Sequence, residues 1–211
     1  MSLKARLQSY FSKPKLQNQI GLSLKQQHLD VSVVGSSRAV ETYQFSLLDG
    51  RYDNAIASLA EMRVSGECNI VLSSKKSQIV QVEKPNVPEE EVTNALKWQI
   101  KDLVSLPPED MIVDYYDMPV GSGGVERVNV VCASKTELTE LVALSDKHHF
   151  RLSQITIEEF AFAKLIPVQD EACLLLCQQP EEDMLILVVK QGKLYFQRRL
   201  RGMANIAQRS V

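Results

Sequence analysis

Most of the features that mark an enzyme, a metalloprotein or a membrane span are missing from these 211 residues. No serine stands in a Gly-x-Ser-x-Gly elbow, and no cysteine has the local sequence of a catalytic nucleophile. No apolar run approaches the roughly 18–20 residues that span a bilayer. The net charge is only −2, which does not favour nucleic acid as a partner. What remains is the expectation of a folded soluble protein that is not a hydrolase.

Cysteine is also scarce, and its placement predicts reduced thiols. Each of the four cysteines lies inside an apolar run that is typical of a strand. Two of them are separated by three residues rather than by the two of a CxxC motif, and no histidine stands near them, so a zinc site is not expected. Buried free thiols suit a reducing compartment, and we expect a cytoplasmic protein. The cysteines are Cys68, Cys132, Cys173 and Cys177.

Hydropathy patterns predict an α/β protein, because hydrophobic residues make up 45% of the chain and their spacing alternates between strand and helix periods. Three strands are expected first, then a helix and a fourth strand, an order that implies an α/β layer with a right-handed crossover. The predicted ranges are strands 20–25, 29–34 and 40–47, helix 52–63 and strand 68–72.

A second group of elements begins at residue 78. After Pro88, three glutamates occupy the first turn of a helix, where negative charge favours the positive end of the helix dipole. This helix is expected to bury Val92, Leu96, Ile100 and Leu103, and to end before Pro107. The other ranges are strands 78–82, 111–118 and 125–132, helix 136–147, strand 152–157, helix 158–166, and strands 172–177, 184–190 and 193–200. The segment after Asp183 contains basic but no acidic residues, so it could bind an acidic partner or simply be exposed to solvent.

Several short segments, in consistent order, resemble the PilM family of type IV pilus proteins. Because the overall identity is low, the MshI branch of the mannose-sensitive haemagglutinin pilus is favoured over PilM proper, and the cytoplasmic domain of the secretion protein GspL is a related alternative. The resemblance covers about residues 18–203. Its segments are 94–100 (NALKWQI), 106–110 (LPPED), 113–116 (VDYY), 128–134 (VNVVCAS), 154–163 (QITIEEFAFA) and 188–196 (VVKQGKLYF).

The resemblance implies an actin-like, RNase H-like fold related to that of FtsA. A first lobe would comprise residues 18–77 and 151–168, interrupted by a strand–helix–strand–strand subdomain at 78–150, with a basic N-terminal segment at 1–17. Residues 169–211 would be only the start of a second lobe, because such a lobe needs on the order of one hundred residues. We therefore expect an amino-terminal fragment, or else a short version whose last strands pack on the first lobe.

In actin-like ATPases two turns with a D-x-G pattern hold the phosphates, since glycine permits close backbone approach and the aspartate positions magnesium. Here the first turn keeps Gly21 but has Ser23 and Lys25 where the family has aspartate and glycine. In the second turn Gln178 and Pro180 occupy those positions, and proline lacks an N–H donor. We expect no ATP turnover, no metal and no cofactor. The alternative is a switch protein of the pilus or type II secretion machinery that binds magnesium-ATP.

The same resemblance implies an interaction scaffold on the cytoplasmic face of the inner membrane. It would bind the cytoplasmic N-terminal peptide of a PilN-like membrane partner in a groove between the first lobe and the inserted subdomain, and would contact other platform proteins. The candidate partner-binding residues are Trp98, Lys97, Lys101 and Tyr115. Residues 1–16 are basic and amphipathic, so they form either a solvated tail or a peripheral membrane contact. A homodimer is left open.

Overall fold

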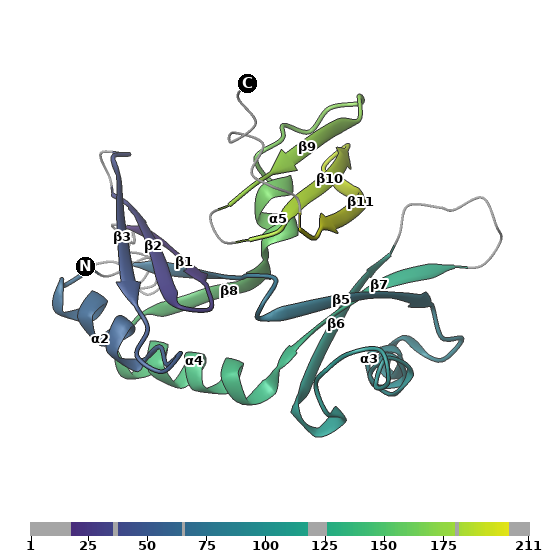
Figure 1. The fold of residues 1–211 in the computed structure, drawn as a ribbon, viewed down its shortest axis with the longest axis horizontal. Helices are drawn as coiled ribbons and strands as arrows, with labels where there is room; N and C mark the ends of the chain where they lie inside the picture. Colours follow the sequence, from purple (N-terminus) through teal and green to yellow (C-terminus); the bar gives the residue numbers. More distant parts are fainter. Residues whose placement is uncertain (1–17, 36–37, 65, 118–125, 180–181, 203–211) are drawn as a thin grey trace, which may run out of the picture. The chain divides into compact units, whose positions relative to one another are not determined.

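The computed structural model describes residues 18–35, 38–64, 66–117, 126–179 and 182–202 (Figure 1). The chain divides into two compact units, one formed by residues 1–70 and 141–155, the other by residues 71–140 and 156–211. No helix within the described residues is long and apolar enough to cross a membrane. The expected segments 1–17 and the chain end after residue 202 lie outside the described residues.

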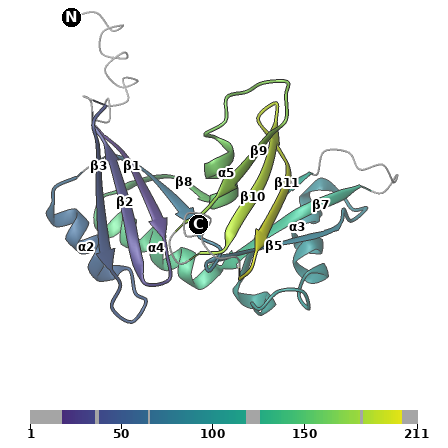
Figure 2. The ribbon, with the colours of Figure 1, turned by 45° about the horizontal axis from the view of Figure 1, so that its top comes forward.

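A five-stranded sheet with the order β3-β2-β1-β4-β8 dominates the first unit. The three strands β1, β2 and β4 alternate between buried and more open positions, as the period of two requires: Ile20, Leu22 and Leu24 are buried in β1. Figure 2 shows α2 and α4 on the same side of this sheet. The elements are β1 (Gln19–Leu24), β2 (His28–Val34), β3 (Val40–Ser46), α2 (Asp53–Glu61), β4 (Glu67–Leu72), α4 (Lys135–Lys147) and β8 (Arg151–Ile157).

In the second unit, the α3 subdomain (residues 77–134) forms an antiparallel sheet with the order β5-β7-β6, on which α3 packs. Buried apolar side chains from α3, β6 and β7 form its core. The predicted strand–helix–strand–strand order is confirmed. The elements are β5 (Ser77–Glu83), α3 (Glu89–Gln99), the 3-10 helix η1 (Pro108–Asp110), β6 (Met111–Asp117) and β7 (Arg127–Ser134).

One predicted core residue of α3 is placed wrongly by its helical spacing. Val92, Leu96 and Ile100 are buried as expected, but the side chain of Leu103 is 59% exposed. The helix ends at Gln99, with Ile100 as its C-cap, and the N–H of Leu103 closes a turn on the carbonyl of Ile100. Leu103 therefore no longer follows the helical period that the prediction extended to it.

The C-terminal sheet is the second part of this unit: α5 (Glu158–Ala163), β9 (Cys173–Cys177), β10 (Met184–Lys190) and β11 (Lys193–Leu200). Its three antiparallel strands have the order β11-β10-β9, and α5 packs on one face, where Leu185, Leu187 and Val189 are buried. Gln191 and Gly192 both have positive φ, as a two-residue hairpin turn requires, which confirms the predicted turn.

Candidate functional site

The β1–β2 turn is where the first phosphate-binding turn was expected, and it is closed by a lysine instead of a glycine. The N–H of Lys25 donates to the carbonyl of His28 at 3.0 Å, which closes the loop around Gln26 and Gln27. Lys25 is buried, and the hydroxyl of Tyr52 donates to its carbonyl oxygen at 3.2 Å. The backbone of Lys25 is thus held by two hydrogen bonds, one from its own N–H and one from the phenol of Tyr52.

The other two residues of this turn motif lie within β1. A Cβ atom at Gly21 would stand 2.7 Å from the Oγ atom of Ser32 on the neighbouring strand β2, so a larger residue there would require the Ser32 hydroxyl to rotate away. Ser23 is half-buried and lies opposite Asp30 in the same ladder.

The second expected turn connects β9 to β10. Gln178 and Gln179 follow β9 directly, whereas Pro180 lies outside the described residues. The Nε2 atom of Gln179 donates to the Oε1 atom of Glu158 at 3.0 Å. The residue next to the expected aspartate position is thus hydrogen-bonded to a carboxylate on α5, which places negative charge beside this turn.

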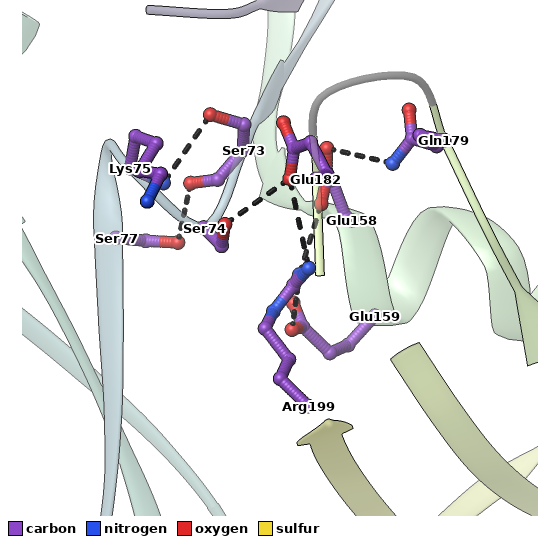
Figure 3. A network of polar contacts seen from close by, with 9 residues as sticks. All are labelled: Ser73, Ser74, Lys75, Ser77, Glu158, Glu159, Gln179, Glu182 and Arg199. Carbon is purple, nitrogen blue, oxygen red and sulfur yellow. Dashed lines mark hydrogen bonds and ion pairs between the residues drawn. The ribbon is translucent and has the colours of Figure 1, made fainter. Parts of the chain in front are cut away.

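Next to Gln179 lies the Arg199 cluster, formed by Arg199, Glu158, Glu159 and Glu182 (Figure 3). The Nη2 atom of Arg199 donates to Glu158 Oε2 at 2.9 Å and to Glu159 Oε1 at 2.8 Å. Its Nη1 atom lies 3.7 Å from Glu182 Oε2, which also accepts a hydrogen bond from the hydroxyl of Ser74 at 3.1 Å. The cluster joins α5, β11, the segment before β10 and the β4–β5 turn.

Burial makes this cluster electrostatically strong. The side chains of Glu158 and Glu159 are only 2% and 3% exposed. Burial acts to lower the pKa of Arg199, but the charges of Glu159 and Glu158, together with its hydrogen bonds to both, raise that pKa above its usual value. Arg199 is therefore permanently charged, and three carboxylates surround one guanidinium. Within the described residues no group of three or more His, Cys, Asp or Glu side chains is arranged to hold a metal ion.

This cluster was not predicted from the sequence. The basic residues of the last segment were expected to be solvated or to contact an acidic partner, and Glu158 and Glu159 were placed at the start of a helix within the segment 154–163 of the family resemblance. One feature of the sequence pointed toward such a cluster, namely the pair of glutamates directly before an apolar run. If the run is buried, the glutamates are buried with it, and buried acidic side chains require a cation as partner. The identity of that cation, about 40 residues further on, follows only from the fold.

The structure separates the four candidate partner-binding residues into two places. Trp98 is 57% exposed near the C-terminal end of α3, with Lys97 half-buried beside it and Lys101 exposed just after the helix. Tyr115 lies on β6, packs against the core under α3 and hydrogen-bonds to the carboxylate of Glu89 at the start of the helix. Because α3 rises about 1.5 Å per residue, Tyr115 and Trp98 are not neighbours.

Tyr115 is held by charges from two sides. Its hydrogen bond to Glu89 raises the pKa of the phenol, and desolvation adds to this. The Nζ atom of Lys84 lies 5.5 Å from the centre of the ring and 3.1 Å from Asp117 Oδ1. Tyr115 therefore links β5, β6 and the first turn of α3, which gives it a structural role.

The α3 subdomain is acidic, in contrast to the nearly neutral chain. Residues 77–134 contain ten acidic and four basic side chains, a formal charge of −6, whereas the whole chain carries −2. Strand β6 is at the edge of the sheet and, among the described residues, pairs only with β7. Its outward residues Ile112 and Asp114 are exposed. The subdomain thus presents a free strand edge, an exposed tryptophan and a surplus of negative charge.

Comparison with known structures shows that the chain has the actin-like fold. No protein-family model matches the sequence, and no curated protein matches it significantly. Solved structures match well despite identities of 16% or less, as expected for a shared fold with diverged sequence.

Three of these structures illustrate the similarity of fold. The cytoplasmic domain of EpsL, an inner-membrane component of the type II secretion system of Vibrio cholerae, matches with a TM-score of 0.62, 16% identity, and coverage of 86% of this chain and 71% of that one. The PilM–PilN type IV pilus biogenesis complex matches with a TM-score of 0.65 and 16% identity, covering 89% and 62%. A Bacteroides thetaiotaomicron protein with an actin-like ATPase fold matches at 0.55 and 12% identity, covering 89% and 71%.

Proposed function

We propose that this chain is part of a scaffold on the cytoplasmic face of an inner membrane, where it binds the cytoplasmic N-terminal peptide of a PilN-like partner of a type IV, MSHA-like pilus. The similarity to EpsL and to PilM in its complex with PilN supports a component of a pilus or type II secretion platform. The chain spans 62% of the PilM–PilN match and 71% of the EpsL domain, so the partners of the whole protein belong to this proposal.

The observation that carries the proposal is the α3 subdomain, with its charge of −6, its free β6 edge and exposed Trp98. Cytoplasmic segments beside a membrane span are enriched in Lys and Arg. A basic peptide is complementary to this subdomain, and an extended peptide can add to an open strand edge through main-chain hydrogen bonds. Trp98 offers a large apolar contact of the kind that often anchors an interface.

A peptide titration tests this function. Trp98 is the only tryptophan, so its fluorescence reports binding to the α3 subdomain. We expect saturable binding of the partner's N-terminal peptide to the full chain at micromolar concentration, confirmed by calorimetry. Trp98→Ala should weaken it at least about tenfold, the loss of roughly 1.4 kcal/mol or more that an anchoring aromatic contributes.

A matched control variant distinguishes specific binding at this surface from non-specific binding of the peptide. Leu48 is exposed in the first unit, and Leu48→Ala should leave the affinity unchanged. Binding should also weaken as salt is raised, because exposed charges are screened. Silence in both fluorescence and heat, or equal effects of both substitutions, would contradict the proposal.

We further propose that the chain is not an ATPase. Lys25 closes the first turn, and Glu158 accepts a hydrogen bond from Gln179 at the start of the second, where its negative charge would repel phosphate oxygens. We expect no heat of binding when the full chain is titrated with magnesium-ATP to millimolar concentration, and no release of phosphate. Saturable nucleotide binding that is lost in Ser23→Ala would instead support the alternative of an ATP-binding switch.

A further inference from the structure

The backbone groups of β6 that point out of its sheet follow from the hydrogen bonds between β5 and β7. In an antiparallel sheet, successive residues of a strand bond alternately to one neighbouring strand and to the other. The N–H of Lys84 donates to the carbonyl of Glu126 at 2.9 Å, which continues the β5–β7 ladder, so the even-numbered residues of β7 bond to β5. Tyr115 lies opposite Val130, an even-numbered residue of β7. The N–H of Tyr115 therefore points away from β7, toward the open edge of β6.

This outward N–H is already bound by a side chain of the same strand. The Oδ1 atom of Asp114 accepts a hydrogen bond from the N–H of Tyr115 at 2.8 Å, and Asp114 is exposed. Aspartate side chains often bind a neighbouring backbone N–H and then compete with a strand ladder for it. A strand that adds to β6 needs the same N–H as a donor. The carboxylate of Asp114 therefore has to leave before main-chain pairing can extend along β6.

The charge of Asp114 is available to a cation from outside the chain. Asp117, the other acidic residue of β6, pairs with the Nζ atom of Lys84 at 3.1 Å, whereas no lysine or arginine of the described residues forms an ion pair with Asp114. Ile112 lies two positions before Asp114, on the same face of the strand, and is 48% exposed. An added strand would place one side chain opposite Asp114 and another opposite Ile112. The strand that fits therefore carries a basic and an apolar residue two positions apart.

We propose that Asp114 gates the β6 edge and makes it selective for an extended peptide with a lysine or arginine opposite Asp114. This inference rests on the proposed binding of a basic peptide by the α3 subdomain. The cation draws the carboxylate away from the N–H of Tyr115, which then donates to a carbonyl of the peptide. Opposite a neutral residue the carboxylate stays on the N–H, and an acidic residue there is repelled. Asp114 thus both closes the edge and selects the strand that opens it.

Amide hydrogen exchange of the full 211-residue chain, followed by NMR without any peptide, tests the closed state. In Asp114→Ala the protection factor of the Tyr115 amide should fall several-fold, because its acceptor is gone. The amide of Tyr116 is the internal control, since this residue lies opposite the odd-numbered Asn129 and bonds to β7, and its protection should stay unchanged. Equal protection of the Tyr115 amide in both proteins would overturn the gate.

Calorimetry with the partner's N-terminal peptide, and with copies in which each lysine or arginine is replaced singly by glutamine, tests the selection. At one basic position the replacement should weaken binding to the unmodified chain about fivefold, the upper value for an opposite-charge pair across two strands. The same replacement should have no effect on binding to Asp114→Ala. The glutamine copy should also bind Asp114→Ala more tightly than it binds the unmodified chain, because the edge of the variant is no longer closed.

Asp102→Ala is the matched control, because it removes one exposed negative charge from the same subdomain but lies outside β6. It should keep the preference for the basic peptide and should not gain affinity for the glutamine copy. If Asp114→Ala binds both peptides more weakly than the unmodified chain does, Asp114 only attracts cations, and the gate is overturned. A preference that survives in Asp114→Ala overturns it as well. If the unmodified chain binds no peptide at all, the proposed function fails, and the gate fails with it.

Discussion

Replacing Arg199 with methionine is expected to lower the free energy of unfolding by about 3–5 kcal/mol, the usual cost of leaving buried charges without their partner. Methionine retains much of the side-chain volume, so the effect is electrostatic rather than a cavity. Glu158 and Glu159 would lose the donor that each now accepts from at 2.9 and 2.8 Å, in surroundings that exclude water. Urea unfolding of the full chain measures the loss.

Two further variants make this result specific. Arg198→Met changes the adjacent residue, which is exposed, and should alter stability by no more than about 0.5 kcal/mol. Adding Glu158→Gln and Glu159→Gln to Arg199→Met should recover part of the loss, because the buried carboxylates then become neutral. A loss below about 1 kcal/mol in Arg199→Met, or no recovery in the triple variant, would show that the cluster is hydrated and contributes little.

The secondary structure followed closely from the sequence because local spacing determines it. In β1 the alternation of Ile20, Leu22 and Leu24 predicted the buried face, and all three are buried. The glutamates after Pro88 marked the start of α3, which begins at Glu89. These signals act over a few residues, so no knowledge of tertiary contacts is needed to read them.

The candidate site was harder to predict from the sequence, because its residues are distant in the chain. Arg199 and Glu158 are separated by 41 positions in the sequence, and Ser74 and Glu182 by 108. Hydropathy patterns extend over a few residues only and do not reveal such pairs. Tyr115 was predicted to contact a partner from its motif alone, and the motif gave no sign that its ring packs on the core and that its hydroxyl bonds to Glu89. The composition of residues 77–134, by contrast, was readable and would have indicated an acidic subdomain.

A difference between two leucines of the α3 region tests where that helix ends. Leu96→Ala should lower the free energy of unfolding by about 2–5 kcal/mol, because it removes a fully buried side chain and leaves a cavity. Leu103→Ala should change it by no more than about 0.5 kcal/mol, since Leu103 is 59% exposed beyond the C-cap Ile100. Urea unfolding followed by the fluorescence of Trp98, which lies on α3, reports on this subdomain directly. Equal losses in the two variants would mean that the helix continues to Leu103, as its helical spacing suggested, and would place Leu103 in the core. The expected inequality would place Leu103 on the surface, beyond the end of the helix at Gln99.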